Sequence, residues 1–208
     1  MRRMLLACVI LAGCGVGVFA QSPGNTPLST PAPTRVRVRG TIVALVGDRL
    51  TVQGRAASVF VDVPADATIT AATEAQLSDV APGSYIGSAA IRQPDGSLRA
   101  LEVHIFPEAM RGTGEGSRTW DLGPDSSMTN GTVGRVAGST GRDLVVDYNG
   151  GQKTVSVPPD VPVIAYAPGT RTLLVPGSNV NIIATRAEDG SLHTNRVTVA
   201  APDVRLAM

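Results

Sequence analysis

Apolar and polar positions follow a period of two in several segments of the chain. Val36–Arg39 alternates one by one, and valine occupies every second position of Val59–Val63. This period of two is typical of β-strands, in which successive side chains point to opposite faces. In the first half of the chain the pattern predicts strands near residues 36–46, 49–54, 57–63, 84–92 and 98–106.

One segment without this alternation lies between the third and the fourth predicted strands. Thr73, followed three residues later by Gln76, resembles a capping box, which opens a helix. Pro82 and Gly83 then break any regular structure. A short helical turn is therefore expected within residues 73–80.

The second half of the chain repeats the first at a constant separation. Asp95–Leu98 recurs as Asp189–Leu192, 94 residues later, and Pro82-Gly83 recurs as Pro176-Gly177 at the same separation. Chance does not preserve one separation over several features, so this is an internal repeat. An Asp-Gly pair between two apolar runs is also a strong hairpin signal. The chain is therefore expected to contain two copies of one β-domain.

Five strands with a short helix between the third and the fourth follow the order of the OB fold. The expected fold is all-β, with two tandem small OB-like five-stranded barrels joined by an irregular connector. The expected parts are a signal peptide (1–20), a disordered tether (21–34), the first OB-like repeat (35–106), a connector (107–129), the second OB-like repeat (130–200) and a C-terminal tail (201–208).

The first twenty residues have the features of an export signal. Arg2 and Arg3 precede an apolar stretch, and Val18-Phe19-Ala20 places small residues where a signal peptidase cleaves. The apolar stretch is shorter than the roughly 20 residues of a membrane span. Cleavage would give a periplasmic or secreted protein. An alternative is lipidation at Cys14, because Leu11–Cys14 resembles a lipobox, and the mature protein would then be lipid-anchored.

Charge and motifs argue against several functions. The full chain carries a formal charge of +1, and removal of Arg2 and Arg3 would make it slightly negative. A near-neutral chain with few, scattered aromatic residues is not expected to bind nucleic acid. The sequence has no nucleophile elbow and no phosphate-binding loop. We therefore expect a non-enzymatic protein without a cofactor, whose partner is a protein or another component of the cell envelope.

The connector contains the distinctive candidate site. Its single tryptophan, Trp120, stands beside Asp121. A linker of this length without secondary structure is usually functional or disordered. The connector either binds a ligand or packs between the two barrels. The candidate ligand-binding residues are Trp120, Arg111, Arg118, Glu115 and Asp121.

Two further patterns leave alternatives open. Arg35, Arg37 and Arg39 alternate with valines and should share one strand face. That face is either an anion or lipid contact or a solvated surface. His104, Glu108 and Met110 offer ligands to a metal, although a surface histidine on a strand is the simpler interpretation.

The order of the short motifs resembles a bacterial exported OB-like family of unknown function. The motifs are Gly40-Thr41-Ile42, Pro82-Gly83, Asp95–Leu98 and the stretch from His104 to Leu122, HIFPEAMRGTGEGSRTWDL. That stretch is similar to small proteobacterial exported proteins often labelled "metal ABC transporter permease". The lack of spanning segments argues against that label.

The resemblance implies a fold and an exported location, but no activity and no catalytic residues. The expected function is thus a non-enzymatic exported (periplasmic) binding or scaffolding module. The alternative is a metal-handling accessory protein of the cell envelope.

Overall fold

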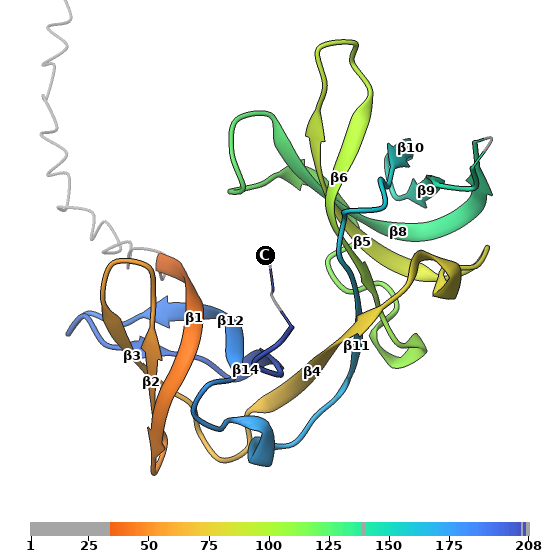
Figure 1. Ribbon diagram of the computed structural model, residues 1–208. Coiled ribbons are helices and arrows are strands. Elements are labelled where there is room, and N and C mark those ends of the chain that lie inside the picture. The colour runs from red at the N-terminus through yellow and green to blue at the C-terminus, as the bar shows by residue number, and fades with distance from the viewer. Residues whose placement is uncertain (1–33, 139, 205, 207–208) are drawn as a thin grey trace, which may run out of the picture. The chain divides into compact units, whose positions relative to one another are not determined.

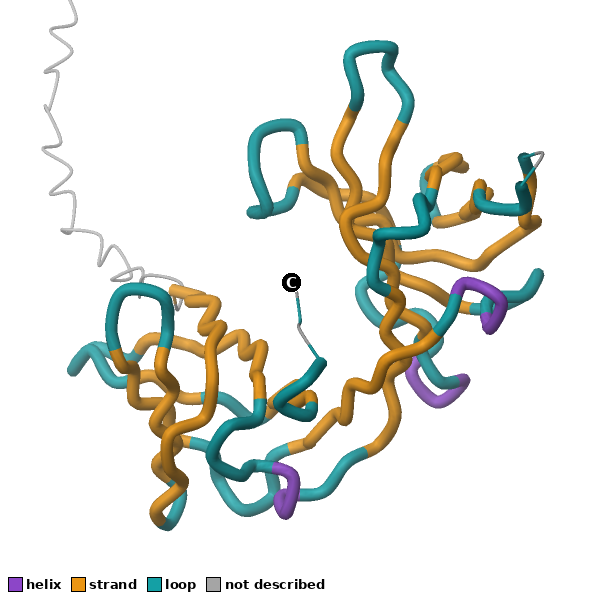
Figure 2. The backbone as a smooth tube through the Cα atoms, viewed as in Figure 1, coloured by secondary structure: helices purple, strands orange, loops and turns teal. Residues whose placement is uncertain are grey.

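The computed structural model describes residues 34–138, 140–204 and 206. The predicted signal peptide, the possible lipidation site Cys14 and nearly all of the predicted tether lie outside these residues. Within them the protein is all-β, as expected: one mixed sheet of 14 strands and three single 3-10 turns (Figures 1 and 2). No helix among the described residues is long and apolar enough to cross a membrane.

Elements of the two repeats correspond along the chain. The first repeat contains β1 (Thr34–Val46), β2 (Arg49–Gln53), β3 (Ser58–Asp62), β4 (Thr68–Ala75), η1 (Leu77–Asp79), β5 (Tyr85–Arg92) and β6 (Leu98–Ile105). The second contains β8 (Ser126–Ala137), β9 (Asp143–Tyr148), β10 (Gly151–Ser156), β11 (Val163–Pro168), η3 (Arg171–Leu173), β12 (Asn179–Arg186), β13 (Leu192–His193) and β14 (Arg196–Ala200). The connector contributes η2 (Glu108–Met110) and β7 (Gly116–Thr119).

The two repeats exchange their last strands. β1, β2 and β3 pair in series, and β1 and β3 then pair with β12 and β13 of the second repeat, which closes a ring. In the same way β8, β9 and β10 form a second ring with β5 and β6 of the first repeat. The prediction that each repeat closes its own barrel is therefore wrong. Each ring closes through a single parallel residue pair, Asp62 with His193 and Ser156 with Arg99, so neither is a clean barrel.

The exchange runs through an antiparallel pair of strands, β4 and β11, that passes between the two rings (Figure 1). Ala72 of the first repeat pairs with Tyr166, the residue that occupies the same position in the second repeat, 94 residues later. The β4–β11 pair is thus symmetric about this residue pair. In the segment predicted to contain a helical turn, Thr73 and the two residues after it belong to β4. The turn is limited to η1, where the backbone N–H of Gln76 donates to Asp79 at 2.8 Å.

Each ring encloses a hydrophobic core drawn from both repeats. The first core combines residues such as Leu50 and Val61 with Ile182 and Val197 of the second repeat, all with no measurable exposure. The second core combines Ile86 and Val103 with Leu144, Val146 and other apolar residues of the second repeat. Burial of apolar area is the main favourable term in folding. Neither repeat therefore has a complete core of its own.

The glycine of the repeated Gly-Thr-Ile/Val motif is required by close strand packing. A Cβ at Gly40 would lie 2.1 Å from the carbonyl oxygen of Gln53, and one at Gly131 would lie 2.2 Å from that of Asp147. Real side chains do not tolerate such distances, so any larger residue would push the first two strands of either ring apart.

Candidate functional site

The connector is held down by contacts within the molecule. It is not irregular throughout, because β7 pairs with β8 from Gly116 to Thr119. The half-buried Trp120 packs with Leu122 against Ala89 and Met128. The guanidinium of Arg37 lies 3.9 Å from the centre of the Trp120 ring, a cation–π contact. The indole therefore stabilises the docking of the connector.

The remaining connector candidates also have partners within the chain. Asp121 accepts a hydrogen bond from Arg39 at 2.9 Å, and this bond lowers the pKa of Asp121 below its usual value. Arg37 lies 3.6 Å from the same carboxylate. Arg111 pairs with Glu108, Arg118 donates to the carbonyl of Gly114, and Glu115 accepts from the backbone N–H of Asn149. These contacts favour the packing role that the sequence left open, and they place Arg37 and Arg39 against the connector.

His104 is not a surface residue, and this expectation is wrong. It is 1 % exposed and contacts the carboxylate of Glu102, which is fully buried. The hydroxyl of Tyr166 lies 3.1 Å from Nδ1 of His104, and burial raises the pKa of Tyr166 above its usual value. The sequence interpretation missed Glu102, although it lies two residues before His104 on β6 and so on the same face. It also missed Tyr166, whose proximity depends on β11 pairing with β6.

These contacts separate the residues of the suggested metal site. Glu108 is exposed and bonded to Arg111, whereas His104 is enclosed with Glu102. Among the described residues, no three His, Cys, Asp or Glu side chains gather as a metal site. No contact therefore favours the metal-handling alternative.

One serine lies close to a histidine, in the repeated Asp-Gly-Ser turn. Ser191 Oγ is 2.6 Å from Nε2 of His193 and 2.6 Å from a carboxylate oxygen of Asp189. A carboxylate only accepts, so the hydroxyl of Ser191 donates its proton to Asp189, and this hydrogen bond lowers the pKa of Asp189. Ser97 makes the same turn with Asp95 in the first repeat. The serine thus has the role of a turn residue in both copies.

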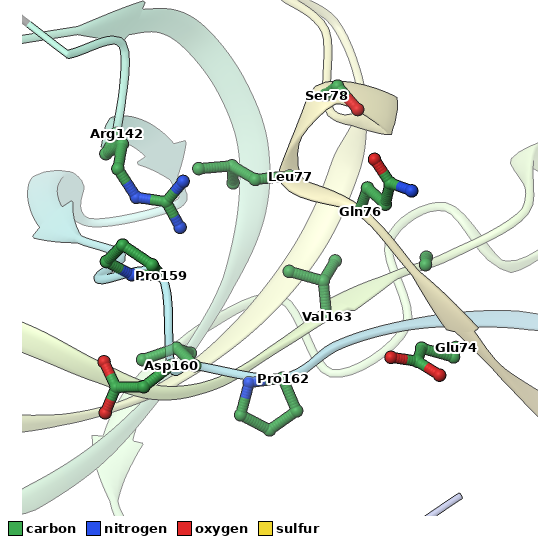
Figure 3. A pocket seen from close by; sticks show the side chains of 11 residues that line it. Glu74, Gln76, Leu77, Ser78, Arg142, Pro159, Asp160, Pro162 and Val163 are labelled. Atoms are coloured by element: carbon green, nitrogen blue, oxygen red, sulfur yellow. The ribbon is translucent and has the colours of Figure 1, made fainter.

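A cavity of about 580 Å³ lies where β4 ends and where the chain passes from β10 to β11. This volume is within the range of small-molecule sites. Its apolar lining includes Leu77, Pro162 and Val163, and its charged lining includes Glu74, Arg142 and Asp160. Figure 3 shows Arg142 and Glu74 on opposite sides, with Leu77 and Val163 between them.

The charged groups of the cavity are only partly engaged. Arg142 Nε donates to the carbonyl of Val157 at 2.6 Å, which fixes the side chain, and its two Nη groups bond to no other described residue. Asp160 accepts a hydrogen bond from Arg99 at 2.8 Å, and this bond lowers the pKa of Asp160. Glu74 is exposed and makes no ion pair with the described residues. A free guanidinium fork and a free carboxylate therefore face the cavity.

In the first ring, the position equivalent to this cavity is occupied by a side chain. The counterparts of Leu77 and Arg142 are Arg171 and Asp48, 94 residues away in each case. The backbone confirms this correspondence, because Val63 donates to the carbonyl of Asp48 at 2.7 Å and Val157 donates to that of Arg142 at 2.9 Å.

Arg171 spans the equivalent position in the first ring with four hydrogen bonds. It donates to the carbonyls of Val63, Pro64 and Gly47 and to the carboxylate of Asp48, at 2.8 to 3.0 Å. In the second ring the same place is lined by Leu77 and Arg142 and is open.

No family model, curated protein or solved structure matches the chain. The resemblance to an exported OB-like family therefore stays a prediction. The cavity was not among the predicted sites, although the repeat contained a signal for it. Comparison of the two copies shows a change from Arg171 to Leu77 and from Asp48 to Arg142.

Proposed function

We propose that this protein is an exported, non-enzymatic binding module that holds a small molecule or the end of a peptide in the cavity beside Arg142. One observation carries the proposal: a position that is filled by Arg171 in the first ring is open in the second ring. The Nη groups of Arg142, which is partly exposed, make no hydrogen bond to the described residues and are available to a ligand. Hydrogen bonds between a guanidinium and an anionic acceptor are among the strong ones in proteins.

The test of this proposal fills the cavity with the residue pair that occupies the equivalent position in the first ring. The double variant Leu77→Arg/Arg142→Asp reproduces the Arg171–Asp48 pair in the second ring. A mixture of amino acids, dipeptides and small organic acids is added to the labelled mature protein. Amide signals of residues 74–78 and 159–163 should shift in the wild type and stay unchanged in the double variant.

The matched control is Val46→Arg/Arg55→Asp, which makes the same kinds of change on the surface. Val46 is 75 % exposed and Arg55 is also exposed, so this variant should bind as the wild type does. Unperturbed signals from β12 in all variants would show that the fold is intact. If the wild-type cavity responds to no compound of the mixture, the proposal is wrong.

We also propose that the two rings are OB-like units that have exchanged strands. When β4 and β11 are left out and β13 and β14 count as one strand, each ring has the order first, second, third, fifth, fourth strand and back to the first. This order fits a five-stranded Greek-key barrel of the OB type. In the first ring, for example, β12 and β13 take the fourth and fifth places.

Export is the third part of the proposal. It is supported by the basic start and the apolar stretch of residues 1–20. Intact mass spectrometry of the protein from envelope fractions should give a soluble chain that begins at Gln21. A lipid-modified chain that begins at Cys14 would support the anchored alternative, and an intact Met1 would contradict export.

A further inference from the structure

We infer that the ligand is an apolar amino acid or a short peptide with an apolar C-terminal residue, bound through its carboxylate by Arg142. This inference rests on the proposed binding function and names the ligand class of the same cavity.

The first argument is the reversal of charge between the two rings. In the first ring the turn between β1 and β2 presents the carboxylate of Asp48, and the guanidinium of Arg171 lies opposite. In the second ring the equivalent turn, between β8 and β9, presents the guanidinium of Arg142, and the side chain opposite is Leu77. The side chain opposite Arg142 is therefore not an acceptor, and the anionic group of a ligand can take this place.

The second argument is the orientation of Arg142. Its Nε is already bonded to the carbonyl of Val157 at 2.6 Å. The plane of the guanidinium is thus fixed and its Nη groups are left for a partner. A planar fork of this kind matches a carboxylate, with two parallel hydrogen bonds. The nearby Asp160 adds negative charge beside Arg142, but its side-chain hydrogen bond is to Arg99, at 2.8 Å.

The third argument is the order of charged and apolar side chains across the cavity. Between Arg142 and Glu74 the lining includes the apolar side chains of Leu77 and Val163 (Figure 3). A ligand that spans this surface needs an anionic end, an apolar middle and a cationic or hydrogen-bond-donating far end. A short peptide with an apolar C-terminal residue has these three parts in this order. A free apolar amino acid matches the anionic and apolar parts alone, because its ammonium and carboxylate groups share one carbon.

The experiment compares four probes on the full mature chain by calorimetry and by amide shifts: leucine, N-acetyl-leucine, leucinamide and acetate. Leucine and N-acetyl-leucine should bind, and leucinamide should bind at least about tenfold more weakly, since it lacks the carboxylate. In the variant Arg142→Gln the affinity for N-acetyl-leucine should fall about 10- to 100-fold, the usual effect of losing hydrogen bonds to a charged group. Arg142→Lys should restore only part of it, because an ammonium has no fork.

The matched control is Arg135→Gln, which removes an exposed arginine from β8 and should leave the affinity unchanged. Equal binding of leucinamide and N-acetyl-leucine, no binding of N-acetyl-leucine, or unchanged affinity in Arg142→Gln would each overturn the carboxylate assignment. Acetate binding as tightly as N-acetyl-leucine would overturn the apolar part. In all these cases, shifts at residues 74–78 caused by other compounds of the mixture would leave the proposed binding function standing.

Discussion

A chain cut between Gly112 and Thr113 is expected to give two fragments, neither of which forms a folded monomer. The fragment that ends at Gly112 contains β1, β2 and β3 but lacks β12 and β13, which close the first ring. It also contains β5 and β6 without β8 and β10. Each fragment thus exposes half of two cores, and a core of half the size cannot offset the conformational entropy of folding.

Mixing the two fragments is expected to restore the native fold as a 1:1 complex. Amide spectra measure folding and light scattering measures the mass of the complex. A matched control inserts two glycines at the same position of the intact chain, which should keep the native spectrum, because a surface loop tolerates lengthening. A homodimer of one fragment, paired through β4 about Ala72, would agree with the exchange of strands. A folded monomer of either fragment would contradict it.

The sequence predicted the positions of most strands because their alternation is local. The strands expected at 36–46, 49–54, 84–92 and 98–106 correspond closely to β1, β2, β5 and β6. Which copy closes which ring is not a local property, since the two copies carry the same pattern. The decision depends on the pairing of β4 with β11, and β4 was not among the predicted strands.

The candidate site was harder to predict than the strands for a related reason. Trp120 and the charged residues around it are conspicuous in the sequence, yet their partners, such as Arg37, lie in a distant segment. Arg142 is inconspicuous by itself. The repeat identifies Asp48 as its counterpart, but the contact of Asp48 with Arg171 and the cavity beside Arg142 are visible only in three dimensions.

The variant His104→Ala is expected to lower the free energy of unfolding by about 3–5 kcal/mol, the typical cost of removing the partner of a buried acidic side chain. The imidazole is 1 % exposed and contacts the carboxylate of Glu102, and its loss also removes the partner of the Tyr166 hydroxyl. A cavity the size of an imidazole adds to the cost. Urea unfolding of the mature chain, followed by the fluorescence of Trp120, measures the change.

The second histidine provides the matched control, because the side chain of His193 is 52 % exposed. His193→Ala should change the free energy of unfolding by no more than about 0.5 kcal/mol, as is usual for surface substitutions. The double variant Glu102→Gln/His104→Ala should recover part of the loss, because the buried group is then neutral. If His104→Ala were as stable as His193→Ala, the buried cluster would not hold β6 and β11 together. If the cluster does hold these strands together, His104→Ala should also speed the amide exchange of Ile164, the β11 residue that pairs with position 104 of β6.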